Sequence, residues 1–286
     1  MGTKTLVTGA AGRVGSRIVR ELAERQEKVV AAVHTPEKAE GLEWPDSVEV
    51  IRFDWDDPTT WGRSDIGIDK VMIIPPGVDG RLHERMIPAI ERFRGDGVTR
   101  FVNLAWMGTE QDESDPMRIV EEHLLRSGTS TTYLRPNWFM QNFEGFIRPM
   151  ITHAHAMSLP AGEGKTSFVD LRDVADVAVA ALTDELHVGK AYTLTGPEAL
   201  SYREAAGIIG ERIGRSVEYL PLSDDEAQAA WIAQGWEQEW AAGIVELYGK
   251  VRTGNAERVT DDVQGVLGRS PIGFRQYAAE RGDVWI

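Results

Sequence analysis

The chain has 286 residues, of which 42% are hydrophobic and 27% charged, as in a globular protein with one large domain and a smaller one. Its 45 acidic residues outnumber 31 lysines and arginines, and the net charge of −14 disfavours binding to nucleic acid or to an anionic membrane surface. The sequence contains no cysteine, no run of 18 apolar residues and no N-terminal targeting pattern. We therefore expect a cytoplasmic protein, monomeric or homodimeric, that binds a small molecule.

In the first half of the chain, short runs rich in β-branched and aromatic residues alternate with amphipathic stretches. Strands are predicted at Thr5–Val7, Val29–Val33, Val48–Phe53, Val71–Ile74, Phe101–Leu104 and Thr131–Leu134. Helices are predicted near 13–25, 80–94 and 116–127. Alternation of this kind predicts an α/β fold with a doubly wound parallel sheet.

The pattern loosens after residue 136. A helix is expected to start near Trp138, followed by an extended segment at 167–170, a helix at 174–182 and a strand at 191–195. Further on, helices are predicted near 201–213, 223–234, 236–250 and 272–280, with one short strand at 217–220. We interpret residues 1–150, with 165–195 returning to them, as the sheet domain, and residues 196–286 as a smaller, mainly helical lobe that binds substrate at the carboxyl ends of the strands.

Glycines punctuate the segment between the first strand and the first helix, where Gly9, Gly12 and Gly15 enclose Ala10, Ala11, Arg13 and Val14. Such spacing directly after a strand permits a sharp turn, close approach of a pyrophosphate and tight packing of the helix on the sheet. The helix N-terminus then directs N–H groups toward the phosphates. The segment from Gly9 to Gly15, including Ala11, Arg13 and Val14, therefore predicts a Rossmann-type dinucleotide site.

The end of the second strand bears on which dinucleotide is bound. A carboxylate at this place usually holds the ribose hydroxyls of NAD, but the chain has His34 there, with Lys38 four residues later. Together with Arg13, these side chains favour the 2′-phosphate of NADP(H), with NAD(H) as the alternative. Asp54 after the third strand is expected near the adenine, and Pro75 and Pro76 after the fourth near the nicotinamide ribose.

The sequence resembles the NmrA-like atypical short-chain dehydrogenase/reductases, which include triphenylmethane-dye, quinone and ergot-alkaloid iminium reductases. The resemblance rests on TGAAGRVG at 8–15, LRPNWFMQNF at 134–143, SFVDLRDVADVAVAAL at 167–182, YTLTGPEALSYREAA at 192–206 and DDVQGVLGRSPIGFRQYAAE at 261–280. It implies a nicotinamide cofactor on a Rossmann fold with a small substrate lobe. It also implies that Pro136 lies beside the nicotinamide and that the pocket is lined by Asn137, Trp138, Phe139 and Asn142.

Most enzymes of the wider superfamily use a Tyr-x-x-x-Lys pair to protonate the acceptor. Here no tyrosine precedes Tyr133, no lysine lies between Lys70 and Lys165, and the corresponding helix reads DPMRIVEEHLL at 115–125. Two interpretations follow: a reductase whose acceptor needs no protein acid, such as an iminium, a quinone or a cationic dye, or an NADP-binding sensor without catalysis. An isomerase that retains its cofactor is a third, less favoured alternative.

Other side chains are weaker candidates. Thr109, Arg118 and His123 are considered as proton donors, although His123 also fits a surface site and Arg118 also fits a helical ion pair. Trp106 and Met107 follow the fifth strand and are expected near the substrate. His153 and His155 lack a third ligand for a metal, so we predict no metal site and place His153 at the substrate entrance.

Overall fold

The computed structural model describes residues 3–62 and 66–286. The chain forms two compact units, the first comprising Met1–Pro136 and Arg172–Thr193, the second Asn137–Leu171 and Leu194–Ile286. The sequence had placed residues 137–150 in the sheet domain. They lie in the second unit because Met140, Phe143 and Ile147 are buried in its core.

The first unit is built on a seven-stranded parallel sheet in the order β3-β2-β1-β4-β5-β6-β9. The strands are β1 (Lys4–Val7), β2 (Lys28–Val33), β3 (Glu49–Arg52), β4 (Lys70–Ile73), β5 (Arg100–Leu104), β6 (Ser130–Pro136) and β9 (Ala191–Leu194). Both β2 and β4 pair with β1, so Leu6 lies between Val30 and Val71. The strand order reverses at β1, which confirms the predicted doubly wound Rossmann fold.

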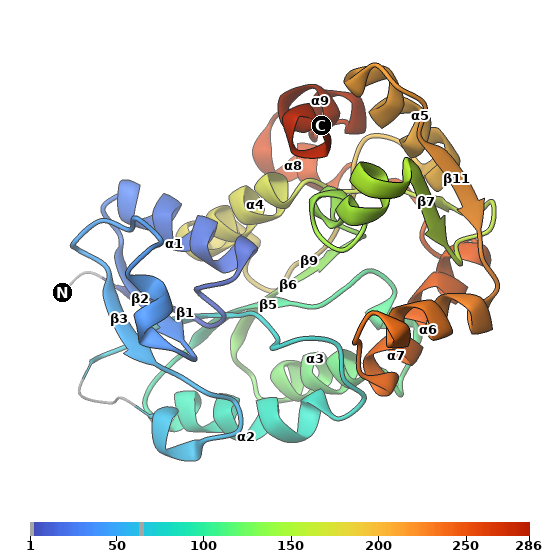
Figure 1. Cartoon of the computed structure of the whole chain (residues 1–286). Coiled ribbons are helices and arrows are strands. Elements are labelled where there is room, and N and C mark those ends of the chain that lie inside the picture. Colours follow the sequence, from blue (N-terminus) through green and yellow to red (C-terminus); the bar gives the residue numbers. More distant parts are fainter. Residues whose placement is uncertain (1–2, 63–65) are drawn as a thin grey trace. The chain divides into compact units, whose positions relative to one another are not determined.

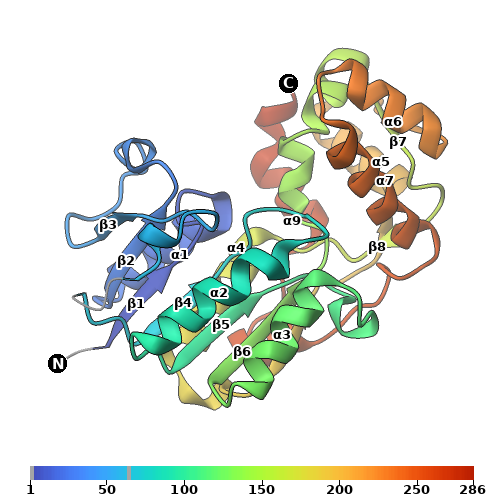
Figure 2. The same ribbon diagram turned by 90° about the horizontal axis from the view of Figure 1, so that it is seen from below.

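Helices cover both faces of this sheet. The helices α1 (Arg13–Glu24) and α4 (Leu171–Thr183) lie on one face, and α2 (Leu82–Gly95) and α3 (Pro116–Arg126) on the other (Figure 1, Figure 2). An ion pair of 3.5 Å between Arg17 and Asp176 joins α1 to α4, and one of 2.6 Å between Glu91 and His123 joins α2 to α3. The apolar strand residues between these layers are almost completely buried.

The second unit contains two small sheets and five helices within the described residues. In one sheet β7 (Ala156–Leu159) runs parallel to β11 (Glu218–Pro221); in the other β8 (Lys165–Thr166) runs antiparallel to β10 (Leu200–Ser201). The helices are α5 (Tyr202–Ile213), α6 (Asp224–Ala233), α7 (Gln238–Arg252), α8 (Asp262–Leu267) and α9 (Phe274–Arg281). Capping boxes begin α5 at Ser201 and α6 at Ser223.

The helix predicted near Trp138 is wrong. The chain instead makes an isolated bridge from Phe139 to Val169, a 3-10 turn at Met140–Glu144 and a π-helical turn at Met150–Ala154. Asn137 Oδ1 accepts from the N–H of Trp138, and such a local bond competes with helix formation. The segment 167–170, predicted to be extended, contributes only that bridge, while β7, β8, β10 and α8 were not predicted.

Candidate functional site

The glycine turn between β1 and α1 is built without room for side chains. A Cβ on Gly15 would lie 2.3 Å from the carbonyl oxygen of Gly9, and one on Gly12 would lie 3.1 Å from it. Gly9 has a φ of +59°, which favours glycine, and its carbonyl accepts from Gly12 N–H at 2.9 Å. Gly12 begins α1 and supplies no capping side chain. The exposed turn and helix N-terminus form a cradle suited to an anionic group.

Thr8 fixes this turn to the neighbouring strand. Its hydroxyl is completely buried, accepts from Ile74 N–H at 2.8 Å and lies 3.2 Å from the carbonyl oxygens of both Met72 and Ile74. The carboxyl ends of β1 and β4 are thereby held together where the strand order reverses, the place at which open α/β sheets bind ligands. Pro75 and Pro76 follow directly, and Pro76 is exposed.

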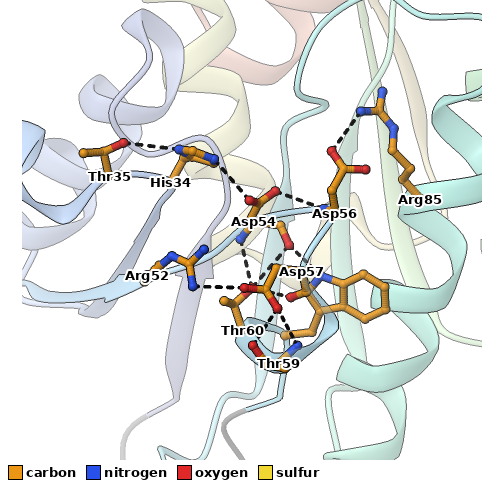
Figure 3. A network of polar contacts seen from close by, with 10 residues as sticks. His34, Thr35, Arg52, Asp54, Asp56, Asp57, Thr59, Thr60 and Arg85 are labelled. Atoms are coloured by element: carbon orange, nitrogen blue, oxygen red, sulfur yellow. Dashed lines mark hydrogen bonds and ion pairs between the residues drawn. The ribbon is translucent and has the colours of Figure 1, made fainter.

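His34, at the end of β2, is oriented by two neighbours (Figure 3). Its Nε2 lies 3.1 Å from Asp54 Oδ2, and its Nδ1 lies 3.2 Å from Thr35 Oγ1. Its side chain is 74% exposed, whereas that of Asp54 is 20% exposed. Asp54 in turn accepts from Asp56 N–H at 3.0 Å, and its own N–H donates to Thr60 Oγ1 at 3.0 Å. The structure thus brings His34 and Asp54 together, although the sequence had given them separate roles.

The loop after β3 carries further charges in the same network. Arg52 Nη1 donates to Asp57 at 3.0 Å, and hydrogen bonds from Thr59 hold the pKa of Asp57 below its usual range. Lys38 and Arg13 are both exposed, and Lys38 makes no ion pair with any residue that the structure describes. The Lys38 side chain after β2 therefore remains accessible to an anion.

The segment from β5 to α3 is different, because its polar groups bond to one another. Trp106 Nε1 donates to Asp115 Oδ2 at 2.7 Å, and Thr109 Oγ1 donates to the Trp106 carbonyl at 2.8 Å. Met107 N–H donates to the carbonyl of Pro136 at 2.9 Å. Arg118, in the first turn of α3, pairs with Glu122 at 3.0 Å. Of the predicted proton donors, Thr109 is thus buried and Arg118 ion-paired.

A buried ion pair lies behind this segment. Glu121 on α3 is 2% exposed, and its carboxylate receives two hydrogen bonds from Arg135 on β6, at 3.0 and 2.7 Å. Burial and the Glu121 charge raise the pKa of Tyr133 to about 12. Its hydroxyl donates to the Glu121 carbonyl at 3.4 Å. A hydroxyl that is buried and holds its proton so firmly is unsuited to the missing acid role.

The remaining predicted site residues lie elsewhere. His123 is near the C-terminal end of α3 and pairs with Glu91. In the second unit, Asn137 Nδ2 donates to Ser167 Oγ and to the Ala256 carbonyl, both at 2.7 Å, which uses both of its N–H groups for internal bonds.

Four more predicted residues belong to the second unit. Trp138, Phe139 and Asn142 are partly buried there, and the Trp138 ring lies 4.8 Å from that of Tyr248. His153 is exposed on the π-helical turn. Their predicted contact with a substrate stays a prediction.

Comparison with known proteins identifies the family of the chain that carries this glycine cradle. Residues 9–185 match the family of NAD(P)H-binding proteins. The chain belongs to this family. It is 32% identical to the NAD(P)H azoreductase of Xenophilus azovorans over 96% of each chain, and 29% identical to the agroclavine dehydrogenase of Claviceps fusiformis over 98% of each. The triphenylmethane reductase of Citrobacter sp., solved with NADP(H), shares its fold, with a TM-score of 0.84 and 23% identity over 98% of this chain and 99% of that one.

Membership of the NAD(P)H-binding family confirms the predicted resemblance and makes the chain a member of an oxidoreductase family that includes NAD(P)H-dependent reductases. The cradle fits the cofactor, because a Cβ on Gly15 would collide with the Gly9 carbonyl oxygen and disrupt the tight turn whose exposed backbone and helix N-terminus suit a pyrophosphate. Sequence reasoning missed Thr8 and the contacts beyond Asp54. The sequence signal that could have found Thr8 is its position directly before Gly9, the first glycine of the turn.

Two searches of the described residues were negative. Across 3–62 and 66–286, no helix is both long and apolar enough to cross a bilayer. In the same part of the chain, no three His, Asp or Glu side chains are grouped so that they could hold a metal ion.

Proposed function

We propose that the protein is an NADPH-preferring reductase that delivers hydride to a planar or cationic acceptor without a protein acid of the Tyr-x-x-x-Lys type. One observation carries this proposal. The dinucleotide cradle at Gly9–Gly15 is intact, while α3, which carries the acid in most relatives of the wider superfamily, has neither tyrosine nor lysine. Binding and orientation are then the protein's main contributions to the rate.

The preference for NADPH is supported by the charges at the end of β2. His34 occupies the place where a carboxylate would bind the ribose hydroxyls of NAD; Lys38 follows it four residues later, and Lys38 and Arg13 are both exposed. Asp54 faces His34 and is thus engaged by an internal partner. The presence of NADP(H) in the Citrobacter reductase agrees with the same preference.

The acceptor is inferred from what hydride transfer requires. When bound, the cofactor supplies a hydride and leaves as NADP⁺. An iminium or a cationic dye becomes neutral on receiving the hydride, so no oxyanion develops that a side chain has to protonate. A quinone gives a stabilised phenolate that water protonates. Relatives named for an azo compound and for agroclavine support acceptors of this kind.

Aromatic side chains of the second unit suit a flat acceptor. Trp138 and Trp236 are partly buried, and each has one ring neighbour within 5.5 Å, Tyr248 at 4.8 Å and Trp231 at 5.3 Å. An aromatic ring that is only partly covered by its neighbours could stack on a planar ring system. We expect Trp138→Ala to raise the KM for the acceptor and to leave the Kd for NADPH unchanged.

The test is oxidation of NADPH, followed by its absorbance, with an azo dye, a cationic triarylmethane dye, a quinone and a cyclic iminium. We expect turnover of at least one, and a tighter Kd for NADPH than for NADH. His34→Asp should weaken NADPH relative to NADH. Lys28→Ala, at the opposite end of β2, is the matched control and should not.

The second candidate, a sensor that binds NADP(H) without turnover, is favoured by the same absence of an acid on α3. Unequal affinities for NADP⁺ and NADPH together with no turnover of any acceptor would replace the reductase by this sensor. Equal affinity for NADPH and NADH would remove the cofactor preference.

A further inference from the structure

A chain of polar contacts joins the loops that follow β2, β3 and β4 in the first unit. Figure 3 shows its part from His34 to Arg85: it begins at His34, passes to Asp54 through the 3.1 Å contact and to the N–H of Asp56 at 3.0 Å. The Asp56 carboxylate then accepts from Arg85 Nη1 at 3.2 Å, and Arg85 Nη2 donates to Asp79 at 2.5 Å. These contacts connect loops at the carboxyl edge of the sheet, where open α/β sheets bind ligands.

Arg85 is placed to act as a bridge between two loops. It lies on α2, its side chain is 29% exposed, and its guanidinium holds one carboxylate from the loop after β3 and one from the loop after β4. Asp79 is fixed in its turn, since its other oxygen accepts from Arg81 N–H at 2.7 Å. Two hydrogen bonds from one planar group restrict both loops more than two separate surface pairs would.

The loop after β3 is well ordered within itself, and Arg85 anchors it to α2. Trp61 Nε1 donates to the Asp54 carbonyl at 2.7 Å, and Asp57 accepts from Thr59 N–H at 3.1 Å. These bonds shape the loop but all lie inside it. Buried Phe53 and Trp55 also pack this loop into the core that contains Phe93 of α2, and the contact between Asp56 and Arg85 adds a polar link toward the loop after β4.

We propose that Arg85 is a positioning residue for the adenosine end of the cofactor. By bridging Asp56 and Asp79 it fixes the loop after β3, so that Asp54 holds the exposed imidazole of His34 where the 2′-phosphate of NADPH binds. This inference rests on the proposed NADPH preference. Arg85 itself touches no phosphate in this scheme and acts through Asp56 and Asp54.

The experiment measures the Kd of NADPH and of NADH for the full chain by the fluorescence of the reduced nicotinamide. We expect Arg85→Met to raise the Kd for NADPH about fivefold, because both ion pairs of the bridge are lost. The Kd for NADH should change less than about twofold, because NADH lacks the phosphate that His34 meets. Arg81→Met is the matched control: Arg81 pairs with Glu84 of α2 and forms no ion pair or hydrogen bond with the described residues of the loop after β3.

A second variant separates positioning from simple charge. Asp56→Asn removes a negative charge near the phosphate and also breaks the bridge. Positioning predicts weaker NADPH binding by Asp56→Asn, and an Arg85→Met/Asp56→Asn double variant no weaker than Arg85→Met alone. Tighter NADPH binding by Asp56→Asn would overturn the proposal, as would equal effects of Arg85→Met and Arg81→Met.

The outcomes also separate this inference from the proposed function. If the unaltered protein binds NADPH no more tightly than NADH, the cofactor preference fails and the role of Arg85 fails with it. If the unaltered protein prefers NADPH and Arg85→Met retains that preference in full, the role of Arg85 alone is refuted. Unchanged unfolding temperatures of the variants would exclude loss of the fold as the cause.

Discussion

Two regions at the carboxyl edge of the same sheet differ in how they use their polar groups. In the glycine turn, Gly9, Ala11 and Gly12 are exposed and no side chain caps α1. In the segment from Trp106 to Glu121, the side chains of Trp106, Thr109 and Glu121 are bonded to other parts of the same unit. The first region offers backbone N–H groups at the N-terminus of α1 to a ligand. In the second region these side chains are hydrogen-bonded within the protein and hold the segment in place.

This difference separates binding from proton transfer. A turn made of glycines cannot supply an acid, and a segment with internally bonded side chains supplies none without first breaking those bonds. In the proposed reaction the cofactor would supply the hydride, and the segment after β5 would be a fixed wall of the site rather than a source of protons. Substitutions in one region at a time therefore test whether stability and cofactor binding respond independently.

The largest effect is expected from Gly15→Ala. The new Cβ would lie 2.3 Å from the Gly9 carbonyl oxygen and 2.9 Å from the Cα of Ala10, and both are backbone atoms that cannot turn aside. We expect the free energy of unfolding to fall by about 4 kcal/mol and NADPH binding to be lost. Urea denaturation and cofactor titration measure the two effects. Gly207→Ala in α5, where no atom lies within 4 Å, is the control and should not destabilise the protein.

Arg135→Met tests the other region. The Glu121 side chain is only 2% exposed, and the substitution removes the main partner of its carboxylate. We expect the free energy of unfolding to fall by about 3 kcal/mol. Replacing both residues, Arg135→Met with Glu121→Leu, should recover much of that loss. The Kd for NADPH should stay unchanged in the folded variants. A large rise in that Kd would mean that the two regions are not independent.

The contrast also explains which features could be predicted from the sequence. The glycine spacing, the alternation of strands and helices and the absence of Tyr-x-x-x-Lys depend on residue types at short separations, and the Rossmann fold predicted from this alternation is confirmed. Partners that are distant in the chain leave no such pattern. Nothing near Asn137 indicates its bonds to Ser167 and Ala256, and nothing near Asp56 indicates Arg85.

The segment after residue 136 shows a second limit. Its apolar residues suggested a helix near Trp138, but burial of Phe143 and Ile147 in the core of the second unit is achieved with 3-10 and π-helical turns. Tertiary packing overrides local preference in such a segment.

A third prediction concerns pH and the helix that follows the glycine turn. Burial, and next the neighbouring Asp176 carboxylate on α4, raise the pKa of Glu21 from 4.5 to about 7, against the opposing charges of Arg17 and Arg25. The unfolded chain releases this proton near pH 4.5, so the stabilisation is fully present below that pH and is lost as the pH rises through about 7.

We therefore expect Glu21→Gln, which mimics the protonated form, to raise the free energy of unfolding at pH 8 by about 2 kcal/mol and to flatten its slope between pH 5 and about 7. Denaturation at a series of pH values measures this slope. Glu24→Gln, at an exposed position of the same helix, is the control. An unchanged slope in Glu21→Gln would show that the carboxyl pair does not titrate in this range.

The smallest effects are expected from substitution of two tryptophans: Trp106, in the segment after β5, and Trp44, which contacts the helix that follows the glycine turn. Trp106 Nε1 donates to Asp115, the N-cap residue of α3, whose other carboxylate oxygen accepts from Met117 N–H. Trp44 Nε1 donates to Ser16 on α1 at 3.1 Å. Replacing either by phenylalanine removes one hydrogen bond and should lower the free energy of unfolding by about 1 kcal/mol. Only Trp44→Phe should also weaken NADPH binding, because Ser16 lies in the first turn of the helix that receives the phosphates. If Trp106→Phe weakened it equally, the fixed wall after β5 would have to be counted as part of the cofactor site.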